Sequence, residues 1–509
     1  MKNRKITQKR LAPLALALVL ALTPGAVVPC ASAAELPENA PVSRDAYLEA
    51  GNWVEIAARR PNPFAYDPSA EMASPNPALL ASWWDAFEDE TLTNLITWTL
   101  WNNRDLVSAR SRVMESRASL GIARSALLPW LDNTDSWTHS DTSDNSTSAG
   151  ARQEISRLGV DASWEIDIFG GRRQDIAAGV AALEADYAAL HSTWVTLSSE
   201  VALNYLSLRT LQERLAISER NLALQIETLD LLNSRYEAGL SDALAISQAR
   251  YTVEQTRSAI PPIRAGIEEA MNGIAILAGA MPGSLGETLG EPRPLPGLDA
   301  AILAGIPADS LRQRPDIRAA ERRLAAQVAR RKSAEADLLP RFYLLGSIGL
   351  ESLHGSNLFS SDSFGFSFGP RITLPIFHGE AIRSNIRVQG EREKQLLAEY
   401  EKTVLGAAAE VRDALVAIAQ EEERSGSLKA GVGAAKAALE IAEDKYRSGL
   451  TDFNNVIGAQ RALLSLQEQE AASDGQRASN VVRVFKALGG GWAPITAENS
   501  GEFAESDKK

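Results

Sequence analysis

Few side chains in this 509-residue sequence are of the types that bind metals or act as nucleophiles. There is one cysteine, Cys30, and the four histidines stand far apart, at His139, His191, His354 and His378. None of them has a second histidine at the spacing that zinc sites use. The glycine-rich phosphate loop, the dinucleotide fingerprint and the G-x-S-x-G nucleophile motif are all missing from the sequence. We therefore predict that the chain is not an enzyme and has neither a cofactor nor a metal site.

The charge balance argues against a polyanionic partner. Fifty-two Lys and Arg residues stand against 65 Asp and Glu residues, which gives a formal net charge of −13. Nucleic-acid binding needs clustered cations that neutralise phosphates and release their counterions, so we expect no nucleic-acid partner. The composition, 45% hydrophobic and 23% charged, is that of a globular chain.

The N-terminus has the pattern of an export signal. A basic stretch at residues 1–10 precedes an apolar run, Leu11–Leu22, which is too short to span a bilayer as a helix. Ala31–Ala33 fits ordinary signal peptidase, which would remove residues 1–33. The alternative is a lipoprotein signal over residues 1–29 with Cys30 lipidated, although Pro29 stands where a small residue is usual. Both interpretations imply that the mature chain is exported.

Three landmarks occur twice in the same order, about 210 residues apart, which predicts an internal duplication. The pairs are Leu127–Pro129 with Leu338–Pro340, Ile168–Gly171 with Ile376–Gly379, and Arg235–Asp242 with Lys445–Asp452. We assign the two repeats to residues 83–280 and 308–492. A Pro- and Gly-rich linker, or crossing strap, joins them over residues 281–307.

Each repeat predicts one helix of moderate length and one much longer helix. The moderate helices are expected over about 84–127 and 315–338, and the long helices over about 171–237 and 380–447. Apolar residues on the long helices step by three and four, as from Tyr187 to Leu208, which is typical of a coiled coil. The predicted fold class is therefore α+β, mostly α.

Each long helix is expected to end in a tight turn followed by a returning helix. Gly239 and Gly449 suit the left-handed backbone conformation that terminates helices. Short polar side chains that could cap the returning helices follow both glycines, namely Ser241 or Asp242, and Thr451 or Asp452. Each chain would thus form two helical hairpins.

Between the helices, a period of two predicts two pairs of strands. Residues 158–167 and 364–374 alternate between apolar and polar, and their partner strands begin near Trp130 and Phe342. A length of about 10 to 12 residues suits strands that cross a bilayer. The polar face would then line a lumen through Asp161, Ser163, Glu165, Ser367, Arg371 and Thr373.

Four strands are too few to close a barrel in a membrane. Hydrocarbon admits strands only in a closed barrel, because an open edge leaves backbone amides unpaired. Roughly eight strands are the smallest number that closes, so the chain must borrow strands from copies of itself. Three copies would supply twelve. The alternative is a water-soluble β-sandwich with one wet face, which leaves the combination of export signal and long coiled coil unexplained.

Several motifs over about residues 80–492 carry a resemblance to a known family. They are Trp83-Trp84-x-x-Phe87-x-Asp89, Asp105-Leu106-x-x-Ala109-x-x-x-Val113, Trp164–Gly170, Leu311–Glu321, the two Tyr-x-x-Gly turns and Leu488–Trp492. With them the chain resembles the TolC-like outer-membrane efflux proteins, specifically the NodT/OprM-type lipoproteins. The resemblance implies a homotrimer with a twelve-stranded outer-membrane barrel, continued by a periplasmic α-helical barrel with a mixed equatorial domain. Residues 34–82 and the linker would contribute to that domain, and residues 493–509 would be a disordered tail.

The resemblance also implies a function. Such ducts join a periplasmic adaptor and an inner-membrane pump, usually of the resistance-nodulation-division type, and they expel drugs or other toxic small molecules. The duct is passive, and the pump supplies the energy. One alternative is the duct of a type I protein-secretion system, and another is an exported coiled-coil protein that transports nothing.

Family members close the periplasmic end with helix tips, which are held by tyrosine, arginine and aspartate contacts and narrowed by acidic rings. The gate and adaptor-docking residues implied here are Arg235, Tyr236, Gly239, Leu240, Asp242, Lys445, Tyr446, Gly449, Leu450, Asp452 and Asn455. The family's gate aspartates fall on Ala245 and on Asn455 or Gly458, none of which is acidic. Asp242 and Asp452 could form a substitute ring or could simply cap helices. The two tyrosines could likewise be packing residues of the coiled coil.

Overall fold

The computed structural model describes residues 82–143, 145, 147, 152–239, 242–297 and 313–491. All of them belong to one compact unit of the chain, Met72–Lys509. The predicted export signal, Cys30, the segment up to residue 81 and the tail 493–509 lie outside the described residues. So do Leu240, Ser241 and residues 298–307 of the predicted linker. Among the described residues, no helix has the length and apolar character needed to cross a membrane.

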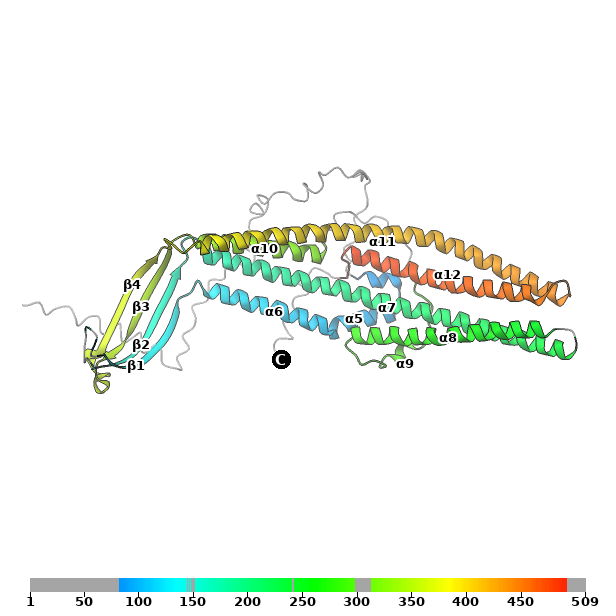
Figure 1. Ribbon diagram of the computed structural model, residues 1–509, viewed down its shortest axis with the longest axis horizontal. Coiled ribbons are helices and arrows are strands. Elements are labelled where there is room, and N and C mark those ends of the chain that lie inside the picture. The colour runs from blue at the N-terminus through cyan, green and yellow to red at the C-terminus, as the bar shows by residue number, and fades with distance from the viewer. Residues whose placement is uncertain are drawn as a thin grey trace, which may run out of the picture. The chain divides into compact units, whose positions relative to one another are not determined.

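The order of the elements repeats once along the chain (Figure 1). The first half contains η1 (Trp83–Phe87), α5 (Glu90–Asn102), α6 (Arg104–Ser125), β1 (Trp130–Asp141), β2 (Arg152–Ile166), α7 (Gly171–Glu237), α8 (Ala243–Leu277) and α9 (Gly286–Leu289). The second half contains α10 (Pro315–Ala336), β3 (Arg341–Ser352), η4 (Gly355–Asn357), η5 (Ser361–Ser363), β4 (Phe364–Thr373), α11 (Ala381–Arg447) and α12 (Phe453–Ala487). Corresponding helices match in length, because α7 and α11 have 67 residues each and α8 and α12 have 35 each.

The single helix predicted over residues 84–127 is wrong, because the chain forms η1, α5 and α6 there. Glu88, with a left-handed φ of 51°, ends η1, and Asp89 caps α5, since its carboxylate accepts hydrogen bonds from the Thr91 and Leu92 amides at 2.8 and 3.2 Å. Asn103 has an extended backbone and caps α6 through the Asp105 amide at 2.8 Å. Short Asp and Asn side chains compete with helical backbone hydrogen bonds in this way. The prediction of one helix overlooked both of these capping residues.

The four strands form one antiparallel sheet in the order β1-β2-β3-β4. β2 pairs Asp161 with Ser347 of β3, and β3 pairs Ser347 with Ser367 of β4. Directly opposed residues of antiparallel strands share a face of the sheet. This register puts all six residues predicted to face a lumen on the same side. The other side is mainly apolar and includes Leu158, Val160, Ile348, Phe366, Phe368 and Ile372.

The helices form two hairpins, α7 with α8 and α11 with α12, and α12 also packs against α7. The main core lies where η1 and α5 meet the middle of α7 and the end of α12. There the ring of Trp83 stacks on Phe485 at 5.5 Å, and the Tyr205 hydroxyl donates to Asp89 at 2.6 Å. The aromatic motif at residues 83–89 therefore joins the N-terminal end of the described chain to both hairpins.

The first part of the predicted linker is held against α7. The side-chain amide of Gln212 donates to the Leu289 carbonyl at 2.8 Å, and the buried Arg209 guanidinium donates to the Glu291 carbonyl at 2.8 Å. Leu285 and Leu289 are buried in the main core. This part of the linker is thus a packed strap across the helices.

Candidate functional site

The first helix tip joins α7 to α8. Gly239 has a φ of 73°, and its amide donates to the Tyr236 carbonyl at 2.9 Å, so the left-handed conformation predicted there is present. Asp242 caps α8, because its carboxylate accepts a hydrogen bond from the Ala245 amide at 2.7 Å. Tyr236 is 49% exposed, so its ring stands largely outside the packing between helices.

The second tip joins α11 to α12 with the same turn. Gly449 has a φ of 71°, and the Leu450 amide donates to the Lys445 carbonyl at 2.8 Å, which completes a Schellman motif. Asp452 occupies the N-cap position of α12 without a capping hydrogen bond from its side chain. The Asn455 side chain instead donates to the Thr451 hydroxyl at 2.6 Å. Leu450 is 77% exposed.

The two tips of one chain contact each other. The guanidinium carbon of Arg235 lies 4.9 Å from the centre of the Tyr446 ring, a distance at which a cation–π interaction forms. Tyr446 also packs on Phe453 with ring centres 5.1 Å apart. Of the predicted gate residues, Arg235 and Tyr446 are therefore brought together across the two hairpins. Asp242, Lys445 and Asp452 are exposed.

A small apolar core lies directly behind these tips. Leu232 of α7, Ala249 of α8, and Phe453, Val456 and Ile457 of α12 are buried together. Ala245 packs against this core, whereas Gly458 is exposed. The position that lacks the family's aspartate in the first hairpin is thus used for packing.

A second contact between the hairpins was not predicted from the sequence. Arg461 of α12 lies over the Tyr251 ring of α8 at 5.1 Å and donates to the Thr252 hydroxyl at 2.7 Å. Both contacts join an arginine on one hairpin to a tyrosine on the other. Tyr251 and Arg461 each follow a tip glycine by 12 residues, but equivalent positions in the two repeats do not by themselves predict a contact.

The polar face of the sheet contains its own charge pairs. Arg157 of β2 donates to the carboxylate of Asp161 at 3.1 Å and to the Ser347 hydroxyl at 2.9 Å. Further along the same face, the register sets Glu165 opposite Tyr343, which is opposite Arg371. The predicted lumen-facing residues therefore lie on a surface that presents charges of both signs.

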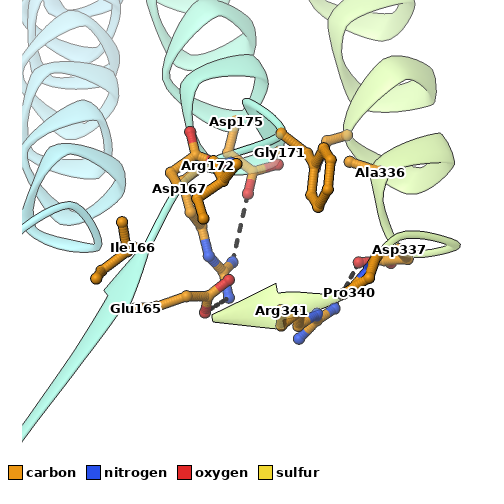
Figure 2. Close-up of a pocket in the computed structure, with 13 residues that line it drawn as sticks. Glu165, Ile166, Asp167, Gly171, Arg172, Asp175, Ala336, Asp337, Pro340 and Arg341 are labelled. Carbon is orange, nitrogen blue, oxygen red and sulfur yellow. Dashed lines mark hydrogen bonds and ion pairs between the residues drawn. The ribbon is translucent and has the colours of Figure 1, made fainter. Parts of the chain in front are cut away.

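A shallow pocket lies where the sheet meets the helices (Figure 2). Arg172, at the start of α7, reaches Glu165 at 2.9 Å and Asp175 at 3.4 Å. The hydrogen bond to Glu165 raises the pKa of Arg172. Arg341 pairs with Asp337 on the other side of the pocket. Glu165 thus lies at the junction between sheet and helix, with its charge balanced.

Asp167 holds the first helical turn of α7 at this junction. Its carboxylate accepts hydrogen bonds from the backbone amides of Arg172 and Arg173 at 3.2 and 3.0 Å. The Arg173 side chain pairs with the same carboxylate at 3.2 Å. The Trp164 indole donates to the Leu127 carbonyl at 2.8 Å, which ties the end of β2 to the end of α6. Charged and aromatic residues of the motif Trp164–Gly170 therefore build a strand-to-helix joint.

Across the described ranges, no three His, Cys, Asp or Glu side chains are grouped so that they could hold a metal ion. The two prominent features of the described chain are an amphipathic sheet with open edges and a pair of hairpin tips that contact each other. Both features suit a passage and its closure.

Comparison with known proteins agrees with this geometry. The family model described as outer membrane efflux protein matches the chain twice, over residues 95–280 and 306–490. Nodulation protein T of Rhizobium leguminosarum bv. viciae is 31% identical, over 85% of this chain and 89% of that protein. The toluene efflux pump outer membrane protein TtgF of Pseudomonas putida is 34% identical, over 82% of this chain and 88% of that protein.

Solved structures show the same fold. The outer-membrane channel OprN superposes with a TM-score of 0.78 at 33% identity, covering 85% of this chain and 100% of that one. A second structure, a membrane protein from Pseudomonas aeruginosa, gives a TM-score of 0.76 at 29% identity, covering 83% of this chain and 98% of that one. The chain belongs to the outer membrane efflux protein family and is an outer-membrane efflux channel, not an enzyme.

Proposed function

We propose that three copies of the chain form the exit duct of a tripartite efflux pump. The open edges of the sheet carry this proposal. β1 and β4 are the two edge strands, and each pairs on one side only within the described sheet. Such edges are tolerated in a membrane only when another strand pairs with them. Joining β4 of one copy to β1 of the next, three times, closes a barrel of twelve strands.

In this assembly the polar face of the sheet lines the lumen and the apolar face meets lipid. The lumen would then present Asp161, Ser163, Ser367, Arg371 and Thr373, with Glu165 near its periplasmic end. Charges of both signs suit a passage that carries different solutes, since neither cations nor anions are repelled throughout. The supporting observation is the register, which gathers these residues on one side.

The helix tips would form the periplasmic gate. The Arg235–Tyr446 contact joins both hairpins of one copy, so it favours the arrangement in which the tips lie close together. Tyr236, Leu450 and the exposed Leu244 stand outside the tip core and are available to an adaptor. Without the family's aspartates at Ala245, Asn455 and Gly458, this gate would depend more on packing and cation–π contacts than on acidic rings.

The partners proposed are a periplasmic adaptor and an inner-membrane pump of the resistance-nodulation-division type. The solutes would be drugs or other toxic small molecules, because similar proteins are named for efflux of toluene, solvents and antibiotics. The duct itself would be passive. Lipidation of Cys30 or removal of residues 1–33 would complete the mature chain.

The experiment that tests this function is accumulation of an ethidium-like dye in cells that lack the gene. We expect higher accumulation than in the parent strain, and restoration of the gene should reverse it. The matched control restores the gene with the substitution Ile348→Pro. Proline lacks the backbone amide that hydrogen-bonds to a neighbouring strand, so at this position in the inner strand β3 it should block barrel formation. Unchanged accumulation would contradict a drug-efflux role. Loss of a secreted protein in the same strains would then favour type I secretion.

A further inference from the structure

Each of the two edge strands, β1 and β4 (Figure 1), carries a single charged residue on the polar face of the sheet. Asp132 of β1 lies opposite Asp161, so it shares the face that we propose lines the lumen. The other β1 residues on this face are Trp130, Thr134, Ser136, Thr138 and Ser140. The β4 residues on this face are Gly365, Ser367, Gly369, Arg371 and Thr373. One edge therefore presents a negative group and the other edge a positive group.

The carboxylate of Asp132 has no cation to balance it within its own chain. Asp132 is exposed and faces Asp161 directly across β1 and β2, and like charges in opposed positions destabilise a sheet. Arg157, the cation of β2 on this face, binds Asp161 at 3.1 Å and Ser347 at 2.9 Å. Among the residues that the structure describes, no Lys or Arg forms an ion pair with Asp132. A cation supplied from outside the sheet would relieve this arrangement.

The guanidinium of Arg371 is in the opposite situation. It is exposed, and it forms no ion pair with an acidic side chain of the described chain. Its neighbour on β3 is Tyr343, and the residue opposite Tyr343 on β2 is Glu165, which Arg172 already binds at 2.9 Å. Because β4 is an edge strand, the other side of Arg371 is open to any strand that pairs with β4.

The internal duplication indicates how β4 would pair with β1 of another copy. Within one chain, β2 of the first repeat pairs with β3 of the second repeat, and Glu165 lies opposite Tyr343. Thr373 stands three residues before the Ile-Phe landmark of its repeat, as Glu165 does in the other repeat. Asp132 stands three residues after the Leu-Leu-Pro landmark, as Tyr343 does. The equivalent pairing between copies therefore sets Thr373 opposite Asp132.

In this register Arg371 is the diagonal neighbour of Asp132 on the polar face. Diagonal neighbours in antiparallel strands lie about 7–8 Å apart, which an arginine side chain can span. We propose that Arg371 of one copy forms an ion pair with Asp132 of the next copy at each of the three seams of the barrel. Alternation alone does not fix the register, since a slide by two residues keeps the polar faces matched. The ion pair restricts the register to arrangements in which these two side chains meet. This inference rests on the trimeric barrel of the proposed function.

The first test exchanges the two charges. Asp132→Arg or Arg371→Asp alone places like charges at all three seams. We expect either variant to lower the fraction of trimer that survives a fixed heating step on gels by about threefold or more. The double variant has opposite charges again, so its trimer fraction should return close to that of the parent.

Asp135→Arg is the matched control for this exchange, because Asp135 also belongs to β1 but lies on the other face, opposite Leu158. Combining Asp135→Arg with Arg371→Asp should restore nothing. The ion pair would be refuted if the exchange of Asp132 and Arg371 left the trimer fraction no higher than in the two single variants.

The second test uses cysteine pairs to measure the register, and Cys30 is the only native cysteine. Oxidation of the double variant Asp132→Cys, Thr373→Cys should link three copies into a band that a reducing agent separates. Opposed residues lie within the Cα separation of about 4.4–6.8 Å that a disulfide allows. Asp132→Cys with Gly369→Cys is the control, since its cysteines would be four residues out of register, roughly 13 Å along the strand. The parent chain reports any link through Cys30. Stronger linking of the control pair would overturn the proposed register.

Failure of the proposed function is distinguishable from failure of this inference. A parent chain that shows no trimer before heating counts against the barrel itself. A parent that is trimeric and restores dye efflux, but that neither cysteine pair links, contradicts the register alone. A trimer that the first cysteine pair links but the exchange of charges does not rescue retains the barrel and its register and contradicts only the ion pair.

Discussion

Substituting Arg235 by glutamine should loosen the gate. Glutamine retains much of the length and the helix propensity of arginine but removes the positive charge above the Tyr446 ring, which lies 4.9 Å away. A cation–π contact at such a half-exposed site is worth about 0.5–1 kcal/mol. Three copies would lose about 1.5–3 kcal/mol together, which raises the ratio of open to closed channels by roughly 10- to 150-fold.

The assay is single-channel recording of the purified protein in planar bilayers, with open probability as the readout. Arg447→Gln is the control, because Arg447 is also a tip arginine but its ion pair with Glu443, at 3.3 Å, stays within α11. We expect R447Q to leave open probability near that of the parent. Adding R235Q to a Tyr446→Leu background should change nothing further. An R235Q channel that stays as closed as the parent would refute the reasoning.

Three further predictions concern stability. Asp167→Ala should lower the stability of the oligomer by about 1–2 kcal/mol per chain, because the first amides of α7 lose their hydrogen-bond acceptor. The oligomer should then dissociate at a lower temperature when heated samples are run on gels, and Asp175→Ala should change that temperature less. Burial and the positive charge of Arg318 lower the pKa of His191 to about 4. The unfolded chain therefore takes up a proton at His191 near pH 6.5 that the folded chain does not, so stability falls as the pH drops from 6.5 towards 4. His191→Phe should flatten this part of the pH profile of the thermal unfolding temperature. Gly475→Ala should cost about 1–3 kcal/mol, because its Cβ would meet the Thr210 side chain. Gly433→Ala has open space around it inside α11, so it should instead raise stability by about 0.5–1 kcal/mol in the same thermal scan.

The long helices could be predicted almost to the residue, because both of their ends carry strong local signals. Glycines in left-handed conformations end α7 and α11, and apolar residues step by three and four over Tyr187–Leu208 and Leu428–Tyr446. Breaks within an apolar pattern were harder to find. Asp89 and Asn103 are the N-caps of α5 and α6, and their capping propensity was the local signal for these two breaks.

Contacts between the hairpins could not be predicted from the sequence. Arg235 and Tyr446 are more than two hundred residues apart, and their pairing depends on how α12 packs against α7. The two repeats also differ in contacts that their similar sequences do not predict. Asp242 caps its helix while Asp452, at the equivalent position, makes no capping hydrogen bond with its side chain, although the two turns have nearly the same sequence.

The strand-to-helix junctions show the same contrast. Asp167 holds the start of α7 through two backbone amides, whereas α11 begins after Glu380 in a left-handed conformation, with no capping hydrogen bond from that side chain. The alternation of the strands predicted which residues share a face, because a period of two is a local property. A local pattern could not predict which junction is held by charge pairs, because these pairs depend on which residues lie close together in the folded chain.

Native mass spectrometry of the detergent-solubilised protein tests the trimeric barrel most directly. We predict a particle of three chains, because three four-stranded sheets close a barrel of twelve strands without a free edge. The mass of a single chain released from this particle also shows whether residues 1–33 have been removed or Cys30 carries lipid. A particle that contains one, two or four chains under conditions that preserve dye-efflux activity would contradict the twelve-stranded barrel.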